Sequence, residues 1–307
     1  MIPHKITVLA ASLFLSLASA LPAVAQTSPA PKPMTQQERI NAQQAAWKAA
    51  AGVAKPGPAN IPLNDQGGIA LKEGIIFIPL PQAADLMRAM GNNVSKNFLG
   101  LVTSKNDNEA WIATISFVKE GYVKDDDAKN WNADDLLASL KEGTEASNKF
   151  RRERGFPALT INGWVEAPAY DSAAHRLVWS LSATSEGAAP GAPQTVNYNT
   201  YQLGREGYYS LNMLTNTANI GTDKGIARTL LAGLEFDSGK RYEDFNEKTD
   251  NVAAYGLAAL VGGAVLKKAG FLAVILAFLA KFWKIGALAV IGLGYGVRKI
   301  FAKKTDA

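Results

Sequence analysis

The stretch TVNYNTYQLGREGYYSLNMLT, residues 195–215, decides the fold expected for this chain. Its two halves, 195–203 and 208–215, are rich in the aromatic and β-branched residues that are typical of β-strands. Between them stand Gly204, Arg205, Glu206 and Gly207, and glycines at such a connection serve the backbone of a hairpin turn. The pattern predicts two strands that are neighbours in an antiparallel sheet.

Three further strands are expected before this pair, because their residues also alternate or favour extended backbone. They cover residues 111–118, 160–167 and 176–183. Successive strands joined by short turns form an antiparallel sheet. The earlier apolar run 69–79 is rich in β-branched residues as well, and Glu73 and Gly74 give it a possible kink. A closing strand or loop is expected at 235–245.

Helices are expected where apolar residues recur at helical spacing, at 81–90 and 222–234. A third helix begins at Asn132, carries an apolar stripe, and ends before Gly155. Together with the strands, these helices make residues 60–250 an α+β domain. Its expected architecture is an antiparallel sheet with covering helices, preceded by a signal peptide and followed by C-terminal transmembrane helices.

The N-terminus has the layout of a secretory signal peptide. A short basic region is followed by an apolar run and then by small residues up to Ala25, after which cleavage is expected. Residues 26–59 are rich in Pro, Ala and Gln and are interpreted as a flexible linker. Within the linker, Thr35 and Glu38 have the spacing of a capping box, which predicts a short, solvated helix over 35–51.

Residues 251–300 are interpreted as a membrane anchor of one to three short apolar helices, followed by a basic tail at 301–307. Each apolar segment is shorter than a hydrocarbon core of about 30 Å, so the number of crossings stays open. Lys and Arg mark the cytoplasmic side of such segments, and small residues permit close helix contact. The residues assigned to the anchor are Val252, Gly256, Gly262, Gly263, Lys267, Lys268 and Trp283. Just before it, Tyr242 and Phe245 are expected at the level of the lipid headgroups.

Charge and cysteine content narrow the possible functions. Of the 32 basic and 27 acidic residues, eight basic residues and one acidic residue follow Leu266, so the preceding part has a net charge near −2. It therefore has no positive excess with which to neutralise phosphates, and nucleic acid is not an expected partner. The chain has no Cys, which excludes disulfides, thiolate metal sites and a Cys nucleophile. We expect no metal site and no cofactor.

Candidate catalytic residues are few. His175 follows Asp171 by four residues, and a histidine with a carboxylate can act as a general base. The alternative is a solvated turn histidine. The acidic run at 125–127 lacks the ligand spacing of a calcium loop and is interpreted as a charged turn before a helix N-terminus.

Candidate binding residues lie in the strand region. Arg205 is placed to present its guanidinium to an anion or to a partner carboxylate. Several aromatic residues on the strands would form a binding face if exposed, and would serve core and cross-strand packing if buried. The candidates are Trp164, Trp179, Tyr198 and Tyr201.

Four ordered segments of this chain resemble the signature blocks of a family of membrane-anchored bacterial proteins, domain of unknown function 2167. They are GYVKDDDAKNWNADDLL from Gly121, NGWVEAPAYDSAAHRLVW from Asn162, VNYNTYQLGREGYYSLN from Val196, and GKRYEDFNEKTDNVAAYGLAALVGG from Gly239. The resemblance covers roughly residues 61–268. It implies a bacterial envelope protein with a signal and an anchor, and it implies no known activity or catalytic residue.

These features predict a binding or scaffold module in the bacterial inner membrane, with its main domain facing the periplasm. Its expected partners are membrane lipid and either another envelope protein or further copies of itself. One alternative is an envelope hydrolase that uses His175 with a carboxylate. Another is a transport or pore accessory that assembles through its C-terminal helices, with Gly262 and Gly263 at the contact.

Overall fold

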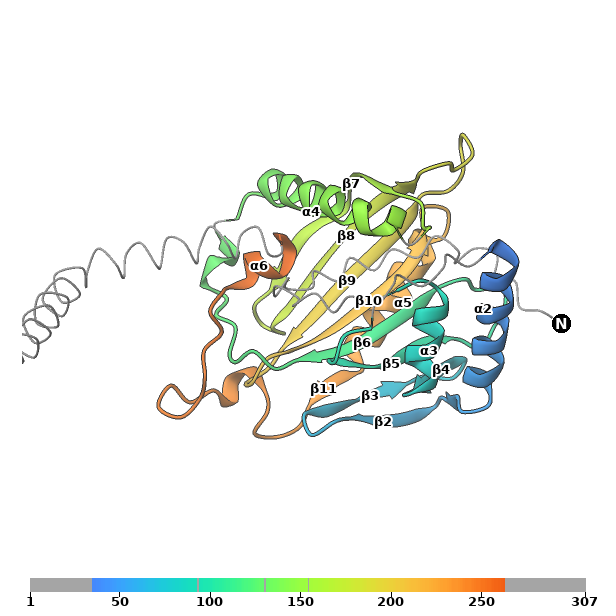
Figure 1. Ribbon diagram of the computed structural model, residues 1–307. Coiled ribbons are helices and arrows are strands. Elements are labelled where there is room, and N and C mark those ends of the chain that lie inside the picture. Colours follow the sequence, from blue (N-terminus) through green and yellow to red (C-terminus); the bar gives the residue numbers. More distant parts are fainter. Residues whose placement is uncertain (1–34, 93, 130, 154, 263–307) are drawn as a thin grey trace, which may run out of the picture. The chain divides into compact units, whose positions relative to one another are not determined.

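An eight-stranded antiparallel sheet forms the centre of the computed structural model, with the strand order β1-β4-β5-β6-β10-β9-β8-β7 (Figure 1). The structure describes residues 35–92, 94–129, 131–153 and 155–262. Its strands are β1 (Lys55–Pro56), β4 (Ile75–Pro79), β5 (Phe98–Ser104), β6 (Ile112–Val118), β7 (Leu159–Asp171), β8 (Arg176–Ser185), β9 (Thr195–Leu203) and β10 (Tyr208–Asn216). β9 and β10 pair over their whole length across the expected hairpin.

A second, three-stranded sheet and one helix cover one face of the large sheet. The small sheet has the order β11-β3-β2 and consists of β2 (Ala59–Leu63), β3 (Gly67–Leu71) and β11 (Leu234–Phe236). The helix is α5 (Ile220–Ala232), which contacts β9, β10, β11 and β3. Apolar side chains from both sheets and from α5 form one buried cluster between these layers. Burial of this apolar surface supplies the main driving force for folding.

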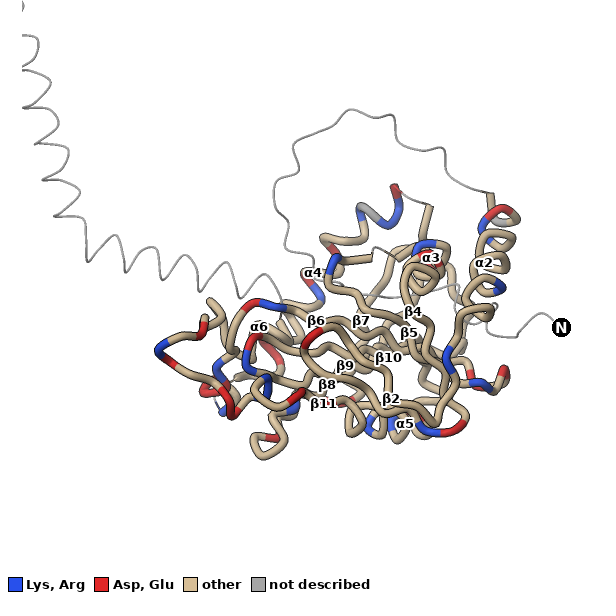
Figure 2. The backbone as a smooth tube through the Cα atoms, turned by 90° about the horizontal axis from the view of Figure 1, so that it is seen from below, with Lys and Arg blue, Asp and Glu red and all other residues tan. Residues whose placement is uncertain are grey.

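The other face carries helices toward its two edges (Figures 1 and 2). α4 (Ala133–Glu153) packs on β7, and α3 (Gln82–Ala89) packs on β4 and β5. α2 (Gln36–Ala51) packs in turn on α3. Figure 2 also shows that charged residues of both signs lie mostly in helices and loops, while the strands are largely uncharged.

Between α4 and α3, the centre of this second face is polar. Directly paired residues in antiparallel strands project to the same side of a sheet. The pairing therefore places Trp179, Asn199, Asn212, Thr114 and Leu101 in one row across β8, β9, β10, β6 and β5. The middle three of these are polar, in contrast to the apolar cluster on the first face.

The structure confirms the mixed α and β architecture with a large antiparallel sheet. Asn132 begins α4 as expected, because its Oδ1 accepts hydrogen bonds from the backbone N–H groups of Asp134 (2.8 Å) and Asp135 (3.3 Å). The run 69–79 is not one kinked segment. It forms β3 and β4, which belong to different sheets, and Gly74 turns the chain between them with φ +81°.

The linker expected at 26–59 contains α2 in its described part. The predicted capping box is present, since Thr35 Oγ1 accepts from the Glu38 N–H and the Glu38 carboxylate accepts from the Thr35 N–H. The helix is not simply solvated, because Ala50 is fully buried and Gln43 donates to the Ala89 carbonyl oxygen.

The C-terminal part of the described chain is a short helix, α6 (Leu257–Gly262), that packs on α4 and on the 3₁₀ turn η2 (Asp126–Lys129). A second 3₁₀ turn, η3 (Tyr242–Asp244), precedes it. Within residues 35–262, no helix has both the length and the apolar composition needed to cross a bilayer. The signal peptide expected at 1–25, the anchor residues Gly263, Lys267, Lys268 and Trp283, and the basic tail lie outside the described residues.

Candidate functional site

An aromatic cluster gathers residues from distant parts of the chain at one end of the large sheet. We call Tyr122, Tyr170, His175, Tyr242 and Phe245 the aromatic corner. The Tyr122 ring stacks on Tyr242 and Phe245 with centroid distances of 4.3 and 3.9 Å, and the His175 ring lies 4.1 Å from that of Tyr242. Tyr242 is buried and donates its hydroxyl to the Val123 carbonyl oxygen at 2.9 Å. It therefore serves packing here, and not the headgroup contact expected from the sequence.

His175 has a tyrosine and not Asp171 as its hydrogen-bond partner among the described residues. Its Nδ1 lies 3.2 Å from the Tyr170 hydroxyl, which donates to the Asp125 carboxylate at 2.8 Å. Because that hydroxyl has one proton and donates it to Asp125, its contact with His175 requires Nδ1–H as the donor and the Tyr170 oxygen as the acceptor. Burial and the neighbouring Asp125 raise the pKa of Tyr170 far above its usual range, so this tyrosine stays protonated.

Asp171 instead organises the turn between β7 and β8. Its Oδ1 accepts from the backbone N–H groups of Ala173 (3.0 Å) and Ala174 (3.2 Å). In the same turn His175 has φ +52°, the left-handed region that is uncommon for residues other than glycine. The turn borders a small cavity of about 290 Å³, which is also lined by Gln202, Phe236 and Arg241.

Arg205 binds a carboxylate of its own chain. Its Nε and Nη2 donate to the two carboxylate oxygens of Asp250 at 2.7 and 2.9 Å, and its Nη1 donates to the Gly239 carbonyl oxygen at 3.1 Å. This bidentate geometry is the strongest common arrangement for an arginine and a carboxylate. The hydrogen bonds from Arg205 hold the pKa of Asp250 well below its usual range. This carboxylate belongs to the same chain, so the anion or partner carboxylate expected for Arg205 stays a prediction.

The neighbouring Glu206 is also fully engaged. It forms ion pairs with Lys119 at 2.7 Å and with Lys240 at 2.6 Å. The hydrogen bonds from both lysines lower the pKa of Glu206 to about 2. The Lys240 pair joins the β9–β10 hairpin to the segment that begins at Gly239, and the Lys119 pair joins it to the chain after β6.

We call residues 239–262 the strap, since this segment runs back across the end of the domain and is bonded to it. Val252 forms a parallel bridge with Tyr122, and its side chain is 44% exposed. At the start of α6, the Asp127 carboxylate accepts from the N–H groups of Leu257 (3.0 Å) and Ala258 (3.1 Å). A Cβ at Gly256 would collide with this carboxylate, so the close approach requires glycine.

The strap changes the interpretation of the first residues assigned to the anchor. Leu257 and Val261 are fully buried, and Gly262 is buried in the same helix. Their apolar character therefore serves packing on the domain as far as Gly262, although their sequence resembles the start of a membrane segment. The four segments quoted for the family resemblance all contribute to this end of the domain, through Tyr122, His175, Arg205 and Asp250.

The aromatic candidates do not form one exposed binding face. Trp179 and Tyr198 are buried, and the strand pairing directs Tyr198 to the face opposite Trp179. Trp164 packs edge-on against Trp179 at 5.9 Å and donates its Nε1–H to the Ala133 carbonyl oxygen of α4. Tyr201 packs edge-on against Tyr208 at 5.6 Å. The sequence pattern could not distinguish exposure from burial, and packing accounts for all four.

Glu166 is a poor candidate for a catalytic acid, because its carboxylate already has basic and tyrosine partners. It accepts from the Tyr198 hydroxyl at 3.1 Å and pairs with Lys224 at 2.5 Å and Arg228 at 3.0 Å. Burial alone would raise its pKa, but Lys224, Tyr198 and Arg228 together lower it. A carboxyl that is ionised at neutral pH is unsuited to protonate a leaving group. Within the described residues, no group of His, Asp and Glu side chains could hold a metal ion.

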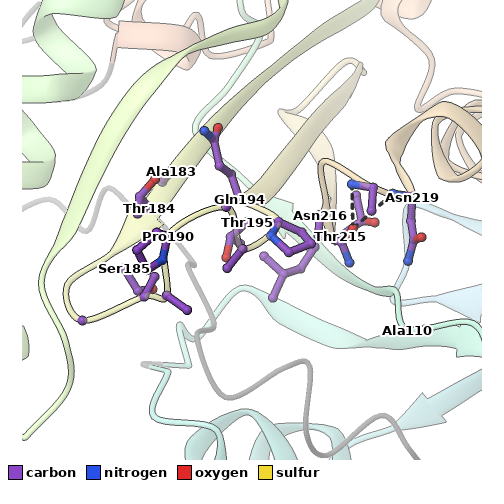
Figure 3. A pocket seen from close by; sticks show the side chains of 18 of the residues that line it. Ala110, Ala183, Thr184, Ser185, Pro190, Gln194, Thr195, Thr215, Asn216 and Asn219 are labelled. Carbon is purple, nitrogen blue, oxygen red and sulfur yellow. Dashed lines mark hydrogen bonds between the residues drawn. The ribbon is translucent and has the colours of Figure 1, made fainter.

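A larger cavity of about 750 Å³ lies at the opposite end of the large sheet from the aromatic corner (Figure 3). It is bordered by the end of β8, the loop at 186–194, the start of β9 and the end of β10. The sequence did not indicate this cavity, because all of its lining residues except Glu186 are uncharged and they match no catalytic or binding motif.

A family model described as "Protein of unknown function (DUF2167)" matches residues 55–292. The chain belongs to the DUF2167 family. No curated protein gives a significant match.

Among solved structures, this DUF2167 chain is similar to the solution structure of cyanobacterial PsbP (CyanoP) from Synechocystis sp. PCC 6803. The similarity has a TM-score of 0.34 at 8% sequence identity, and it covers 55% of this chain and 86% of that chain. A similarity of this size supports no functional inference.

Proposed function

We propose that the chain is a membrane-anchored binding or scaffold module of the bacterial envelope, with its α+β domain facing the periplasm. The strap is the observation that supports this proposal most. It is bonded to the domain by the Arg205–Asp250 pair, the aromatic corner and the Asp127 contact with α6. It leads directly into the apolar, lysine-punctuated sequence after Gly262. A domain held by a firmly bonded strap suits presentation of a surface at a membrane.

A binding role is favoured over a catalytic one because the ionisable side chains already have partners within the domain. Asp250, Glu206 and Glu166 are each held ionised by basic partners, and Asp127 accepts from backbone N–H groups. Among the described residues, His175 has a hydrogen bond with Tyr170, whose pKa is raised, and none with a serine or threonine. This arrangement gives the hydrolase alternative little support, because a general base needs a nucleophile or water within hydrogen-bond reach.

The alternative of assembly through Gly262 and Gly263 is also less favoured. Gly262 is buried within α6 and belongs to the strap. Its substitution would therefore disturb strap packing before any contact between copies. A change in oligomeric state on mutating Gly262 would not by itself identify a helix–helix interface.

In-cell photo-crosslinking followed by mild detergent extraction and mass analysis tests the proposal. A photoreactive amino acid at Leu80 or Val165 samples the surface well, because both are large apolar side chains exposed on the domain. Lys105, an exposed charged residue, is the matched control position. The proposal predicts a defined envelope partner that is captured from Leu80 or Val165 and not from Lys105. Recovery of the uncrosslinked monomer alone from every position would contradict the scaffold role.

A further inference from the structure

The centre of the second face of the large sheet carries polar side chains that are partly accessible. Tyr201, Ser210 and Ser116 lie side by side on β9, β10 and β6, and Asn212 lies in the neighbouring row. All four are half-buried. The Asn212 Nδ2 and the Ser116 hydroxyl have no hydrogen-bond partner among the described residues. This face therefore offers hydrogen-bonding groups, whereas the opposite face carries the apolar core.

The described helices flank this polar centre without covering it. Figure 2 shows α3 and α4 on one side of the sheet and α5 on the other. On the polar side, α3 packs on β4 and β5, α4 packs on β7, and α6 packs on α4. None of these three helices makes extended contact with β6, β9 or β10. The polar centre is thus an unpartnered strip of sheet between two helices.

The chain enters the domain at the rim of this face. The helix α2 begins at Gln36 and packs on α3. In its first turn, Arg39 Nη1 lies 3.9 Å from the position of a Cβ on Gly155, just beyond the end of α4. The end of α3 meets the same region, since a Cβ on Gly91 would collide with the Phe156 ring. The residues before α2 therefore join the domain beside both helices that flank the polar centre.

The segment that precedes α2 is long enough to cross the face. Residues 26–34 are QTSPAPKPM, and their three alternating prolines favour polyproline II. At a rise of about 3.1 Å per residue, this segment spans about 28 Å. From β5 to β8 the sheet has four strand spacings of about 4.8 Å, which is about 19 Å.

A polyproline strand also has the chemistry that suits this face. Its backbone makes no internal hydrogen bonds, and proline has no N–H, so it presents mainly carbonyl acceptors. Asn212 Nδ2 and the Ser116 hydroxyl are matching donors. Aromatic side chains commonly contact proline rings, and Tyr201 stands in the same row as Ser116. An apolar segment, such as the sequence after Gly262, would instead bury these polar groups without partners.

We propose that residues 26–34 dock on this polar face as an extended strand between α3 and α4. The segment then ties the N-terminal end of the chain to the domain and occupies the polar face. This inference is independent of the binding role proposed above, because the segment and the face belong to one chain.

Disulfide trapping tests the docking, since only introduced cysteines can react. Ser116→Cys is combined in turn with Ser28→Cys, Ala30→Cys and Lys32→Cys in the full-length chain in mild detergent. The proposal predicts an intramolecular disulfide in at least one of these pairs under mild oxidation. Asn60→Cys with the same three partners is the matched control and should form none, because Asn60 is exposed on the small sheet, which covers the opposite face.

Three results would overturn the proposal. One is the absence of an intramolecular disulfide in every Ser116→Cys pair, and another is equal disulfide formation with Asn60→Cys. The third is a disulfide between two chains, which would assign the face to a second copy. If Ser116→Cys does not fold, Ser210→Cys replaces it, because Ser210 lies in the same row.

The rate of maleimide labelling gives an independent readout. Replacing residues 26–34 with Gly and Ser at equal length keeps the reach of the segment and removes its prolines. This replacement should raise the labelling rate of Ser116→Cys at least tenfold and leave that of Asn60→Cys unchanged. An unchanged rate for Ser116→Cys would contradict the docking.

Discussion

Leu257→Ala probes whether the strap is part of the folded domain. The residue begins α6 and is completely buried, while the sequence around it resembles a membrane segment. If Leu257 packs on the domain, shortening it should destabilise the domain itself. If it lies in lipid, the same change should leave the stability of the domain unaltered and weaken membrane association. The two interpretations therefore predict opposite results in two measurements.

The magnitude follows from the burial. Replacing a fully buried leucine with alanine removes three carbon atoms, at about 0.8 kcal/mol for each buried methylene, and leaves a cavity. A loss of roughly 2.5–4 kcal/mol in the free energy of unfolding is expected. For a domain of this size, 1 kcal/mol corresponds to a shift in Tm of about 2–4 °C. The variant should therefore melt roughly 5–15 °C below the parent chain.

Thermal unfolding of the full-length chain in mild detergent, monitored by tryptophan fluorescence, measures this shift. Trp111 and Trp179 are buried in the folded domain, so their fluorescence changes when it unfolds. Val252→Ala is the matched control, because Val252 lies in the same strap with its side chain 44% exposed, and its loss should shift the Tm by no more than about 2 °C. Equal Tm values for the two variants, with reduced membrane association of Leu257→Ala, would refute the packing of the strap.

Three further predictions concern the rest of the domain. Gly100→Ala should destabilise by about 1–3 kcal/mol, because its Cβ would collide with a buried phenylalanine ring, whereas Gly163→Ala meets open space; urea midpoints compare them. Asn148→Ala should lower the free energy of unfolding by about 2–3 kcal/mol, since the Asn148 side chain bonds both the N–H and the C=O of Leu159. Ser147→Ala, at an exposed position, is the control and should not lower it. Equal urea midpoints for the two variants would contradict this prediction. The pKa of Glu206 is lowered to about 2, so its ion pairs stabilise the fold fully above pH 4.5 and progressively less as the pH falls toward 2. Between pH 5 and 3, the urea midpoint of Glu206→Gln should therefore decrease less than the urea midpoint of the parent chain.

Local patterns predicted the regular elements well, because strands and helices carry their own periodicity. The hairpin of β9 and β10 and the start of α4 at Asn132 are both encoded by neighbouring residues. The prediction failed at 69–79, where a continuous apolar run could not reveal that β3 and β4 pair in different sheets. β5 was not anticipated, since its sequence, FLGLVTS, does not alternate between apolar and polar residues and has a glycine inside it.

The contacts that build the aromatic corner and the strap could not be predicted from spacing. Arg205 and Asp250 stand 45 positions apart, as do Tyr170 and Asp125, and only the folded chain brings them together. The apolar residues of α6 were ambiguous for another reason. The sequences of a buried helix and of a membrane helix are both rich in apolar residues, and only the length of the apolar run distinguishes them.

The membrane topology of the chain is the most direct test of an anchored, outward-facing domain. Because the chain has no native cysteine, a maleimide can label only the cysteine that is introduced. Val165→Cys and Thr305→Cys are each labelled in spheroplasts with a membrane-impermeant maleimide, before and after lysis. Val165 is exposed on the domain, and Thr305 lies in the basic tail expected in the cytoplasm. The account predicts labelling of the first in intact spheroplasts and of the second only after lysis. Labelling of Val165→Cys only after lysis would contradict it.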